Sequence, residues 1–214
     1  MIKAVIFDLD GVLVSTDMLH YKAWKKLADQ LGIHNFTLAD NVRQRGVSRM
    51  ASLEVLLEKS NKRYSESEKI QLAEIKNKIY VESLSKLSEK DVLPGAGEVI
   101  GFLRKHGIKI ALGSASKNAQ LILEKTGLFP MFDFISSGLN TTRSKPDPEV
   151  FLVAAEGLEV KPEDCLIVED SDAGIQAAKT GGMYAMAVGS ARENPLADLG
   201  VESLNKIQQL FLPQ

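Results

Sequence analysis

Cysteine is nearly absent from this sequence, since it occurs once among 214 residues. A single thiol, Cys165, cannot form an intramolecular disulfide or a paired-cysteine zinc site, so we expect a reducing compartment. No apolar run reaches the length that spans a membrane, and the apolar stretch at the start is too short for a signal peptide. These absences together predict a cytoplasmic protein.

The sequence also lacks an excess of charge of either sign. Lys and Arg number 26 and Asp and Glu number 28, which gives a net charge of -2. A chain with balanced charge lacks the excess of basic residues that binds nucleic-acid phosphates or an anionic membrane, so we expect no nucleic-acid partner and no membrane binding. Hydrophobic residues make up 44% of the chain, which is enough for a folded core. The length allows one large domain or a core with an inserted module.

Short apolar runs alternate with helical patterns along most of the chain. The runs fall at 2–7, 108–112, 133–135, 165–168 and 183–188, and the helical patterns at 96–106, 117–126, 148–157 and 171–180. Continuously apolar strands that alternate with helices are typical of a parallel sheet covered on both faces. The sequence therefore predicts an α/β fold with a doubly wound parallel sheet.

Residues 16–91 break this alternation, because they contain only helical signals. Ser48 is a candidate N-cap for one helix, and Ser65 begins a capping-box pattern that would open another. We therefore expect an inserted α-helical cap domain at 16–91. The α/β core domain would then consist of 1–15 and 92–214.

Acidic side chains follow two of the predicted strands. Asp8 and Asp10 come directly after the first strand, and Glu169 and Asp170 after the fourth. The carboxyl ends of parallel strands meet at one edge of the sheet, where ligands bind in folds of this type. Mg²⁺ prefers oxygen ligands and usually shares them with a substrate phosphate. These four residues are thus candidate ligands of a magnesium ion.

The same edge contains groups suited to phosphoryl transfer. An aspartate carboxylate can attack phosphorus to form an aspartyl-phosphate, which fits Asp8, and Asp10 can then exchange a proton with a sugar hydroxyl. Ser114 ends another strand before a helix, so its hydroxyl and the following backbone N–H groups would bind an anion. Lys145 would bring a positive charge to the transferring group. Each residue alone is also compatible with a turn, a helix cap or surface charge, but their convergence favours catalysis.

The motifs resemble those of a known superfamily. In chain order they are Asp8-Leu9-Asp10-Gly11-Val12, Ser114, Lys145-Pro146 and Glu169-Asp170-Ser171. This set is similar to that of the haloacid dehalogenase superfamily of phosphohydrolases and mutases. Further motifs resemble those of the β-phosphoglucomutases: Gly46-Val47-Ser48-Arg49, Lys76-Asn77, Ser114-Ala115-Ser116-Lys117-Asn118, and His20 with Trp24. The likeness extends to about Gly189.

The resemblance implies a bisphosphate mechanism with Mg²⁺ as cofactor. Asp8 would be phosphorylated, pass the group to a hexose phosphate and be rephosphorylated from the other end of the bisphosphate, with glucose 6-phosphate as product. Asp10 would be the acid/base, aided by His20 and Lys76. Arg49, Lys117 and Asn118 would hold the phosphate that is not reacting. Trp24, Gly46 and Ser116 complete the substrate-binding residues that the resemblance implies.

Several points stay open at this stage. Many members of the superfamily have an acid where this chain has Ser15, at the cap entrance, which puts cap closure in question. On the residues alone, Arg49 and Lys76 can also be solvated surface charges, and His20 and Trp24 packing residues of the cap. A phosphatase of small sugar phosphates would share every core residue, and a non-catalytic phosphometabolite-binding regulator is a third alternative. We expect a monomer that binds a small sugar phosphate.

Overall fold

The structure is a computed structural model and describes residues 1–211. Within this range, six parallel strands form one sheet in the order β3-β2-β1-β4-β5-β6. The strands are β1 (Ala4–Phe7), β2 (Lys109–Gly113), β3 (Phe134–Ser136), β4 (Cys165–Glu169), β5 (Tyr184–Ala187) and β6 (Leu199–Gly200). The predicted α/β fold with a parallel sheet is confirmed. The two-residue strand β6 was not predicted, because it is too short to show a pattern.

Strand β1 lies at the centre of the sheet, and its neighbours explain its composition. Ala4 pairs with Lys109 of β2 on one side and with Cys165 of β4 on the other. All four residues of β1 are fully buried. A strand with sheet on both sides and helices on both faces meets no solvent, which is why β1 is continuously apolar rather than alternating.

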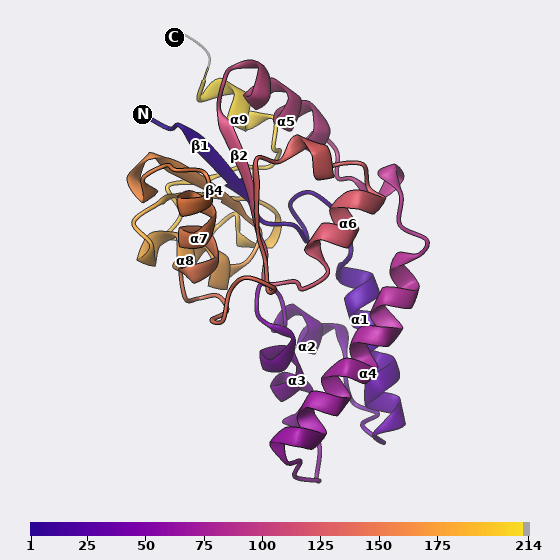
Figure 1. The fold of residues 1–214 in the computed structure, drawn as a ribbon. Coiled ribbons are helices and arrows are strands. Elements are labelled where there is room, and N and C mark those ends of the chain that lie inside the picture. The colour runs from indigo at the N-terminus through magenta and orange to yellow at the C-terminus, as the bar shows by residue number, and fades with distance from the viewer. Residues whose placement is uncertain (212–214) are drawn as a thin grey trace.

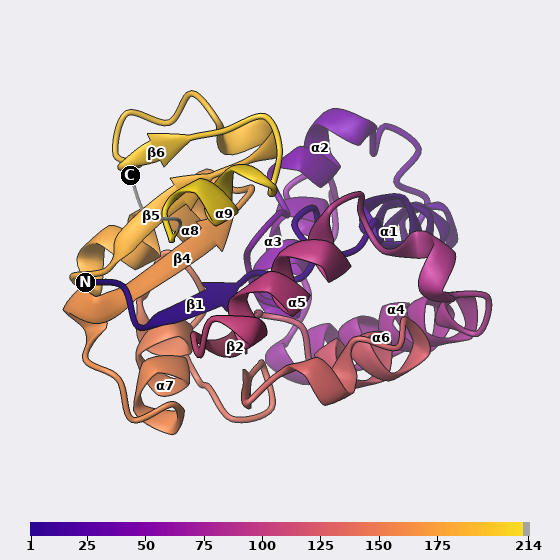
Figure 2. The same cartoon turned by 90° about the horizontal axis from the view of Figure 1, so that it is seen from above.

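Alternate residues of β1 belong to two separate hydrophobic clusters, one on each face of the sheet. Val5 and Phe7 pack with α5 (Ala96–Lys105), α6 (Ala119–Lys125) and α9 (Lys206–Gln209). Ala4 and Ile6 pack with α7 (Glu149–Gly157) and α8 (Asp172–Thr180). Figure 2 shows the sheet from above, with α5 and α9 on one side of it. Because side chains alternate along a strand, each of the strands β1 to β5 contributes to both clusters.

The helical segment between β1 and β2 forms a distinct part of the molecule, and we call residues 16–91 the cap. Its helices are α1 (Asp17–Gln30), α2 (Leu38–Val42), α3 (Arg49–Leu57) and α4 (Glu66–Leu84). Figure 1 shows α1 and α4 side by side at the end of the molecule opposite both chain termini. A separate cluster that includes Trp24, Leu27, Leu53 and Leu56 holds the cap together. The domain boundaries after residues 15 and 91 stay a prediction.

Two chain segments connect the cap to the core, and they lie next to each other. Val14 forms an antiparallel bridge with Val92, and the N–H of Leu93 donates to the carbonyl of Leu13 at 2.8 Å. The inner end of the cap also contributes Tyr80 to the cluster between the sheet and α5. The cap therefore rests on the core as well as being linked to it.

Helix ends agree with the sequence in most places but not all. Ser48 accepts from the N–H of Ala51 at 3.2 Å, and Ser65 forms the predicted capping box. The helix expected from residue 117 begins only at Ala119, after the N-cap Asn118. Helices α2 and α9, of 5 and 4 residues, were missed because so short a helix shows no period. None of the helices among residues 1–211 combines the length and apolarity that crossing a membrane requires.

Two helical glycines allow a direct test of how tightly the sheet edge is packed. A Cβ built at Gly101 on α5 meets nothing within 4 Å, whereas at Gly174 on α8 it would lie 2.0 Å from Oε1 of Glu169. We expect Gly101→Ala to stabilise the protein by about 0.5–1 kcal/mol, because alanine restricts the unfolded chain. Gly174→Ala should instead destabilise by about 1–3 kcal/mol, because the Glu169 side chain must move. Urea unfolding measures both, and equal stabilisation by the two variants would contradict this packing.

Candidate active site

A cavity of about 860 Å³ lies between the carboxyl ends of the strands and the cap. The predicted site residues that line it from the core are Asp8, Asp10, Ser114, Ser116, Lys117, Asn118, Lys145 and Asp170. Those that line it from the cap are His20, Trp24, Gly46, Arg49 and Lys76. Glu169 is the exception, since it is fully buried and does not reach the cavity wall. The structure thus brings the predicted residues together around one space.

The position of this cavity follows from the strand order. The connections run outward in opposite directions from β1 and β4, so the crevice where ligands bind in such sheets lies between these two strands. Asp8 comes directly after β1, and its N–H donates to the carbonyl of Val168 in β4 at 2.9 Å. Glu169 is the last residue of β4. The acidic residues therefore lie at the place that the topology leaves open.

A buried ammonium group connects the two strand ends. Lys145 Nζ lies 2.7 Å from Oδ1 of Asp8 and 2.5 Å from Oε1 of Glu169. Burial alone would lower the pKa of Lys145, but the carboxylates of Asp8 and Glu169 outweigh it and raise that pKa above its usual range. The other carboxylate oxygen of Glu169 accepts from the N–H and hydroxyl of Ser171, at 2.7 and 2.8 Å. Both oxygens of Glu169 are therefore engaged within the protein.

Three carboxylates form what we call the acidic cluster: Asp8, Glu169 and Asp170. One oxygen of each lies within 4.8 Å of the others, close enough for one metal ion. Burial raises the pKa of Asp8 to about 6, although Lys145 opposes the rise. Burial, then Glu169 and Asp8, raise the pKa of Asp170 to about 8. Repelling carboxylate oxygens fit a hard divalent cation. The Asp10 side chain lies outside this group, so its part in metal binding stays a prediction.

A second buried lysine approaches the site from the cap. Lys76 Nζ lies 2.8 Å from Nδ1 of His20, and Nε2 of His20 lies 3.8 Å from Oδ2 of Asp10. Burial, then Lys76, lower the pKa of His20, so the ring is neutral. An ammonium donor at Nδ1 leaves the ring proton on Nε2, where it faces Asp10. The three residues form a chain from the cap to the core.

Asp10 is held in a state suited to proton donation. Burial, then the nearby Asp8, raise the pKa of Asp10 to about 8. Its Oδ1 is buried and has no hydrogen-bond partner among residues 1–211. A carboxyl group with this pKa carries its proton at neutral pH. Asp10 can therefore act as an acid, as the sequence predicts, whereas Asp8 has the lower pKa of the pair.

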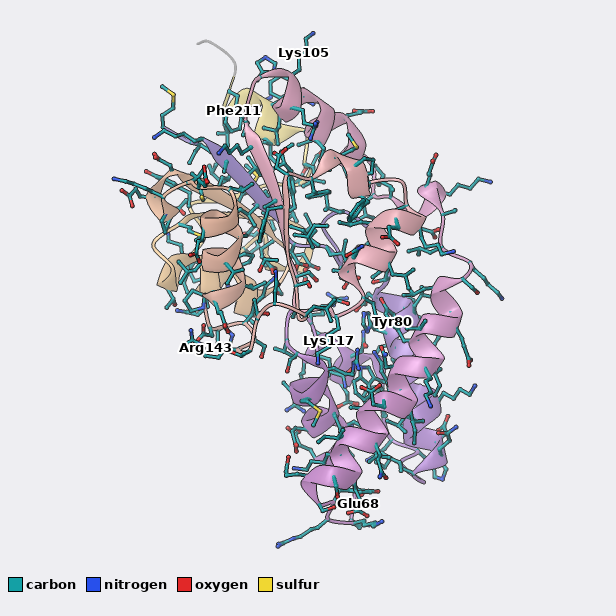
Figure 3. The ribbon with its side chains drawn as sticks, in the orientation of Figure 1. Glu68, Tyr80, Lys105, Lys117, Arg143 and Phe211 are labelled. Atoms are coloured by element: carbon teal, nitrogen blue, oxygen red, sulfur yellow. The ribbon has the colours of Figure 1, made fainter. Side chains whose placement is uncertain are left out.

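Aromatic rings hold Lys76 in place. Its Nζ lies 4.7 Å from the ring centre of Trp24 and 4.6 Å from that of Tyr80, and the His20 ring stacks on Tyr80 at 4.0 Å. Burial lowers the pKa of Lys76 to about 7, and Arg49 contributes. Trp24 is itself 1% exposed within the cap. Tyr80, which sequence reasoning missed, lies with Lys117 at the junction of cap and core (Figure 3).

Cationic side chains also reach the cavity from both of its walls. The guanidinium of Arg49, on the cap, lies 3.0 Å from the exposed carboxylate of Glu74, and burial lowers its pKa. Lys117, on the core, makes no ion pair with any residue in the range 1–211. Asn118 donates to Oδ1 of Asn77 at 3.0 Å, which ties core to cap. Arg49 and Lys117 are thus cationic residues of the cavity wall that take no part in the contact of Lys145 with Asp8 and Glu169.

The segment from Ser114 to Asn118 is a turn rather than the start of a helix. The N–H of Ser116 donates to Oγ of Ser114, and the N–H of Asn118 donates to Oγ of Ser116, both at 3.2 Å. Each hydroxyl oxygen therefore fixes the backbone two residues on, which delays the helix to Ala119. Ser114 is a buried residue that lines the cavity. Its role in anion binding stays a prediction.

The cap entrance has an acidic residue even though residue 15 is a serine. Ser15 lines the cavity and its N–H donates to the carbonyl of Asp91 at 3.2 Å. The acidic residue here is Asp17, two positions on, which also lines the cavity. Gly46 has a φ of +72°, and a Cβ there would lie 2.5 Å from Oγ of Ser171. The absence of a side chain at residue 46 therefore allows the cap to approach the core.

Comparison with known proteins places the molecule in a family. The family described as haloacid dehalogenase-like hydrolase matches residues 2–182, which include every site residue named above. The chain belongs to this family. The resemblance seen in the sequence motifs is thereby confirmed. Within a haloacid dehalogenase-like protein, the acidic cluster is consistent with a magnesium site.

Members of two activity types are similar to this haloacid dehalogenase-like protein. A β-phosphoglucomutase of Bacillus subtilis (strain 168) is 41% identical over 207 residues, which are 96% of this chain and 91% of the relative. A crystal structure of a β-phosphoglucomutase from Clostridium difficile is also 41% identical, with a TM-score of 0.93 over 99% of this chain and 95% of that one. A phosphorylated carbohydrates phosphatase of Thermotoga maritima is 33% identical over 184 residues, covering 85% and 82%.

The raised pKa values predict how stability depends on pH and metal. Asp8, Asp10 and Asp170 have pKa values of about 6, 8 and 8, against about 4 in an unfolded chain. Between about pH 4 and 8 the folded, metal-free protein binds more protons than the unfolded one, so this stability is lost as pH rises. His20, whose pKa is lowered, opposes the trend below about pH 6.5, and Lys76 opposes it above about pH 7, but three carboxyl groups outweigh each of them in turn. We therefore expect a lower Tm at pH 8 than at pH 5 in EDTA.

Magnesium should reverse this loss, because it competes with protons for the same carboxylates. Added Mg²⁺ is expected to raise Tm more at pH 8 than at pH 5, as measured by calorimetry. Asp170→Asn keeps the shape of the side chain and should lose most of this gain. An equal gain at both pH values, or an undiminished gain in the variant, would contradict the acidic cluster as the metal site.

Proposed function

We propose that the protein is a Mg²⁺-dependent phosphosugar mutase, which interconverts β-glucose 1-phosphate and glucose 6-phosphate through an aspartyl-phosphate and a hexose bisphosphate. The main support is that the cavity has cationic groups in two separate places. Lys145 contacts Asp8, whereas Arg49 on the cap and Lys117 on the core line the cavity outside that contact. Such a cavity suits a ligand with a phosphate at each end. Identity of 41% to two β-phosphoglucomutases supports the same activity.

Asp8 is the nucleophile in this proposal. Its carboxylate oxygen bonds to phosphorus, and the bond from phosphorus to the sugar oxygen breaks. Lys145 holds one oxygen of Asp8 at 2.7 Å and so fixes the direction of the carboxylate. Ser114 would contact the oxygens of the transferring group, with Lys145 close by. Asp8, Asp170, Glu169 and Asp10 would hold Mg²⁺, which when bound offsets the negative charge of phosphoryl group and carboxylates.

Asp10 moves the proton. With a pKa of about 8 it begins protonated and donates to the sugar oxygen that leaves phosphorus. In the reverse half-reaction it takes the proton from the hydroxyl that attacks the aspartyl-phosphate. His20 Nε2 faces Asp10, and Lys76 fixes the orientation of the imidazole through Nδ1. These two residues position the acid/base and do not themselves touch the reacting atoms.

The phosphate that is not reacting would bind Arg49, Lys117 and Asn118. After the first transfer the bisphosphate must turn around, so each of its ends meets Asp8 in turn. Trp24, Gly46 and Ser116 line the same cavity and would bound the space for the sugar. The cap covers this space, so water is excluded while the aspartyl-phosphate waits for the second sugar. The protein is a mutase if a sugar hydroxyl attacks the aspartyl-phosphate, and a phosphatase if water attacks it.

A phosphatase of small sugar phosphates is the second candidate. It is favoured by the 33% identity to the phosphorylated carbohydrates phosphatase of Thermotoga maritima. The nucleophile, the lysine and the acidic cluster would serve both reactions equally. The difference lies in whether water or a sugar hydroxyl attacks the aspartyl-phosphate.

A product assay distinguishes the two. The protein is incubated with Mg²⁺, β-glucose 1-phosphate and a trace of glucose bisphosphate, and glucose 6-phosphate is measured against free phosphate. A mutase gives mainly glucose 6-phosphate. Stoichiometric free phosphate without isomerised sugar would instead identify the phosphatase. Binding without turnover on any phosphorylated sugar would support the regulator.

The variant Arg49→Ala tests whether Arg49 binds the phosphate that is not reacting. We expect mutase turnover to fall by about 10- to 100-fold, because a charge-assisted contact of about 1.5–3 kcal/mol is removed. Hydrolysis of a small phosphate ester, which lacks a second phosphate, should change little. Arg63→Met is the control, since Arg63 is an exposed arginine of the same cap. Equal losses on both substrates would refute the anchoring role of Arg49.

A further inference from the structure

One arginine of the cap reaches across to the core beside the acidic cluster. Arg45, in the loop between α2 and α3, donates from Nη1 to Oγ of Ser190 at 3.1 Å. Ser190 belongs to the 3-10 turn Gly189–Ala191, after β5, and its hydroxyl donates to the carbonyl of Asp170 at 2.7 Å. One hydroxyl group thus joins the cap to the backbone of a residue in the acidic cluster.

The same guanidinium also binds the start of the cap. Its Nη2 lies 2.8 Å from Oδ2 of Asp17, and its Nε donates to Oδ1 of Asp17 at 3.3 Å. Asn41 donates to Oδ1 of Asp17 at 2.8 Å. Asp17 is the first residue of α1, directly after the segment that links core to cap. A guanidinium bound at both edges is held in one orientation, as fork-shaped contacts with a carboxylate require.

The next residue makes the contact closer still. Gly46 lies against Ser171, where any side chain would collide with the serine hydroxyl. Ser171 follows Asp170 in the chain, and the hydroxyl of Ser190 bonds to the Asp170 carbonyl. Residues 45 and 46 of the cap therefore each contact a serine that is next to Asp170, either in the chain or through a hydrogen bond. The positive charge of Arg45 also acts on the Asp170 carboxyl, against the effect of its acidic neighbours.

A neighbouring arginine shows that this arrangement is particular to Arg45. Arg43, two residues earlier, forms a two-fold contact with Glu58 at 2.7 and 2.8 Å, wholly within the cap. Asn77 with Asn118 is a further polar contact between cap and core, but it involves no charged side chain. Arg45 is therefore a cationic residue of the cap that is joined, through the hydroxyl of Ser190, to the backbone of the acidic cluster.

We propose that Arg45 is a positioning residue that fastens the cap over the acidic cluster, through Asp17 on the cap and Ser190 on the core. The consequence for chemistry, which rests on the proposed function, is that Arg45 sets how long the aspartyl-phosphate is shielded from water. Loss of Arg45 opens the cap more often without changing Asp8, Asp10 or Lys145.

Amide hydrogen exchange of the substrate-free protein tests the fastening directly, independent of any activity. In Arg45→Met we expect exchange in segments 44–48 and 188–191 to rise roughly fivefold, the effect of about one lost polar contact. Arg43→Met is the matched control and should leave segment 188–191 unchanged. Ser190→Ala should reproduce the rise at 44–48 while keeping the arginine. Unchanged exchange in both Arg45→Met and Ser190→Ala would overturn the proposal.

The product ratio tests the consequence. With β-glucose 1-phosphate, we expect Arg45→Met to raise the ratio of free phosphate to glucose 6-phosphate by roughly fivefold, in step with the open fraction. Faster exchange with an unchanged ratio would overturn the shielding role. If the wild-type protein forms no glucose 6-phosphate, the proposed mutase function fails, while the exchange experiment still decides whether Arg45 fastens the cap.

Discussion

The buried contact of Lys145 with Asp8 and Glu169 is the interaction around which the rest of the site is arranged. Its three side chains are between 0% and 8% exposed, so their charges have lost nearly all contact with water. Desolvation of this kind costs several kcal/mol per ion, and only close, well-directed contacts offset it. The contact therefore fixes three chain segments at once: the end of β1, the end of β4 and the loop before α7. Backbone pairing sets the register of β1 and β4, and this lysine links the side chains at their ends, beside the cavity that Asp8 and Asp170 line.

The cap contains a second buried lysine in a different environment. Lys145 has two carboxylates within hydrogen-bond distance and keeps its charge, whereas Lys76 has a neutral imidazole and two aromatic rings, and its pKa falls to about 7. Its electrostatic support from the core is Asp10. Cap and core thus meet through His20, whose Nδ1 lies 2.8 Å from Lys76 Nζ and whose Nε2 faces Asp10. This contact and the separate contact of Arg45 with Ser190 explain how a helical insertion can close over the sheet edge.

The sequence was sufficient for those parts of the site that depend on local pattern. Apolar runs followed by acids locate Asp8 and Glu169, and parallel strands bring their ends together whatever the details of packing. The sequence could not reveal that both oxygens of Glu169 bind Lys145 and Ser171, because that depends on a lysine 24 residues away. Arg45 and Ser190 lie 145 residues apart and neither has a local signal. The helix near Lys117 was placed two residues early, because the serine side chains of the turn bond to its backbone.

The central claim, that Asp8 receives the phosphoryl group, can be tested by trapping the intermediate. The protein is mixed with Mg²⁺ and glucose bisphosphate, quenched in acid within the first turnover and digested for mass spectrometry. The account predicts that the peptide containing Asp8 gains the mass of one phosphoryl group and that Asp8→Asn abolishes the gain. A phosphoryl group on another residue, or turnover in Asp8→Asn at the wild-type rate, would contradict it.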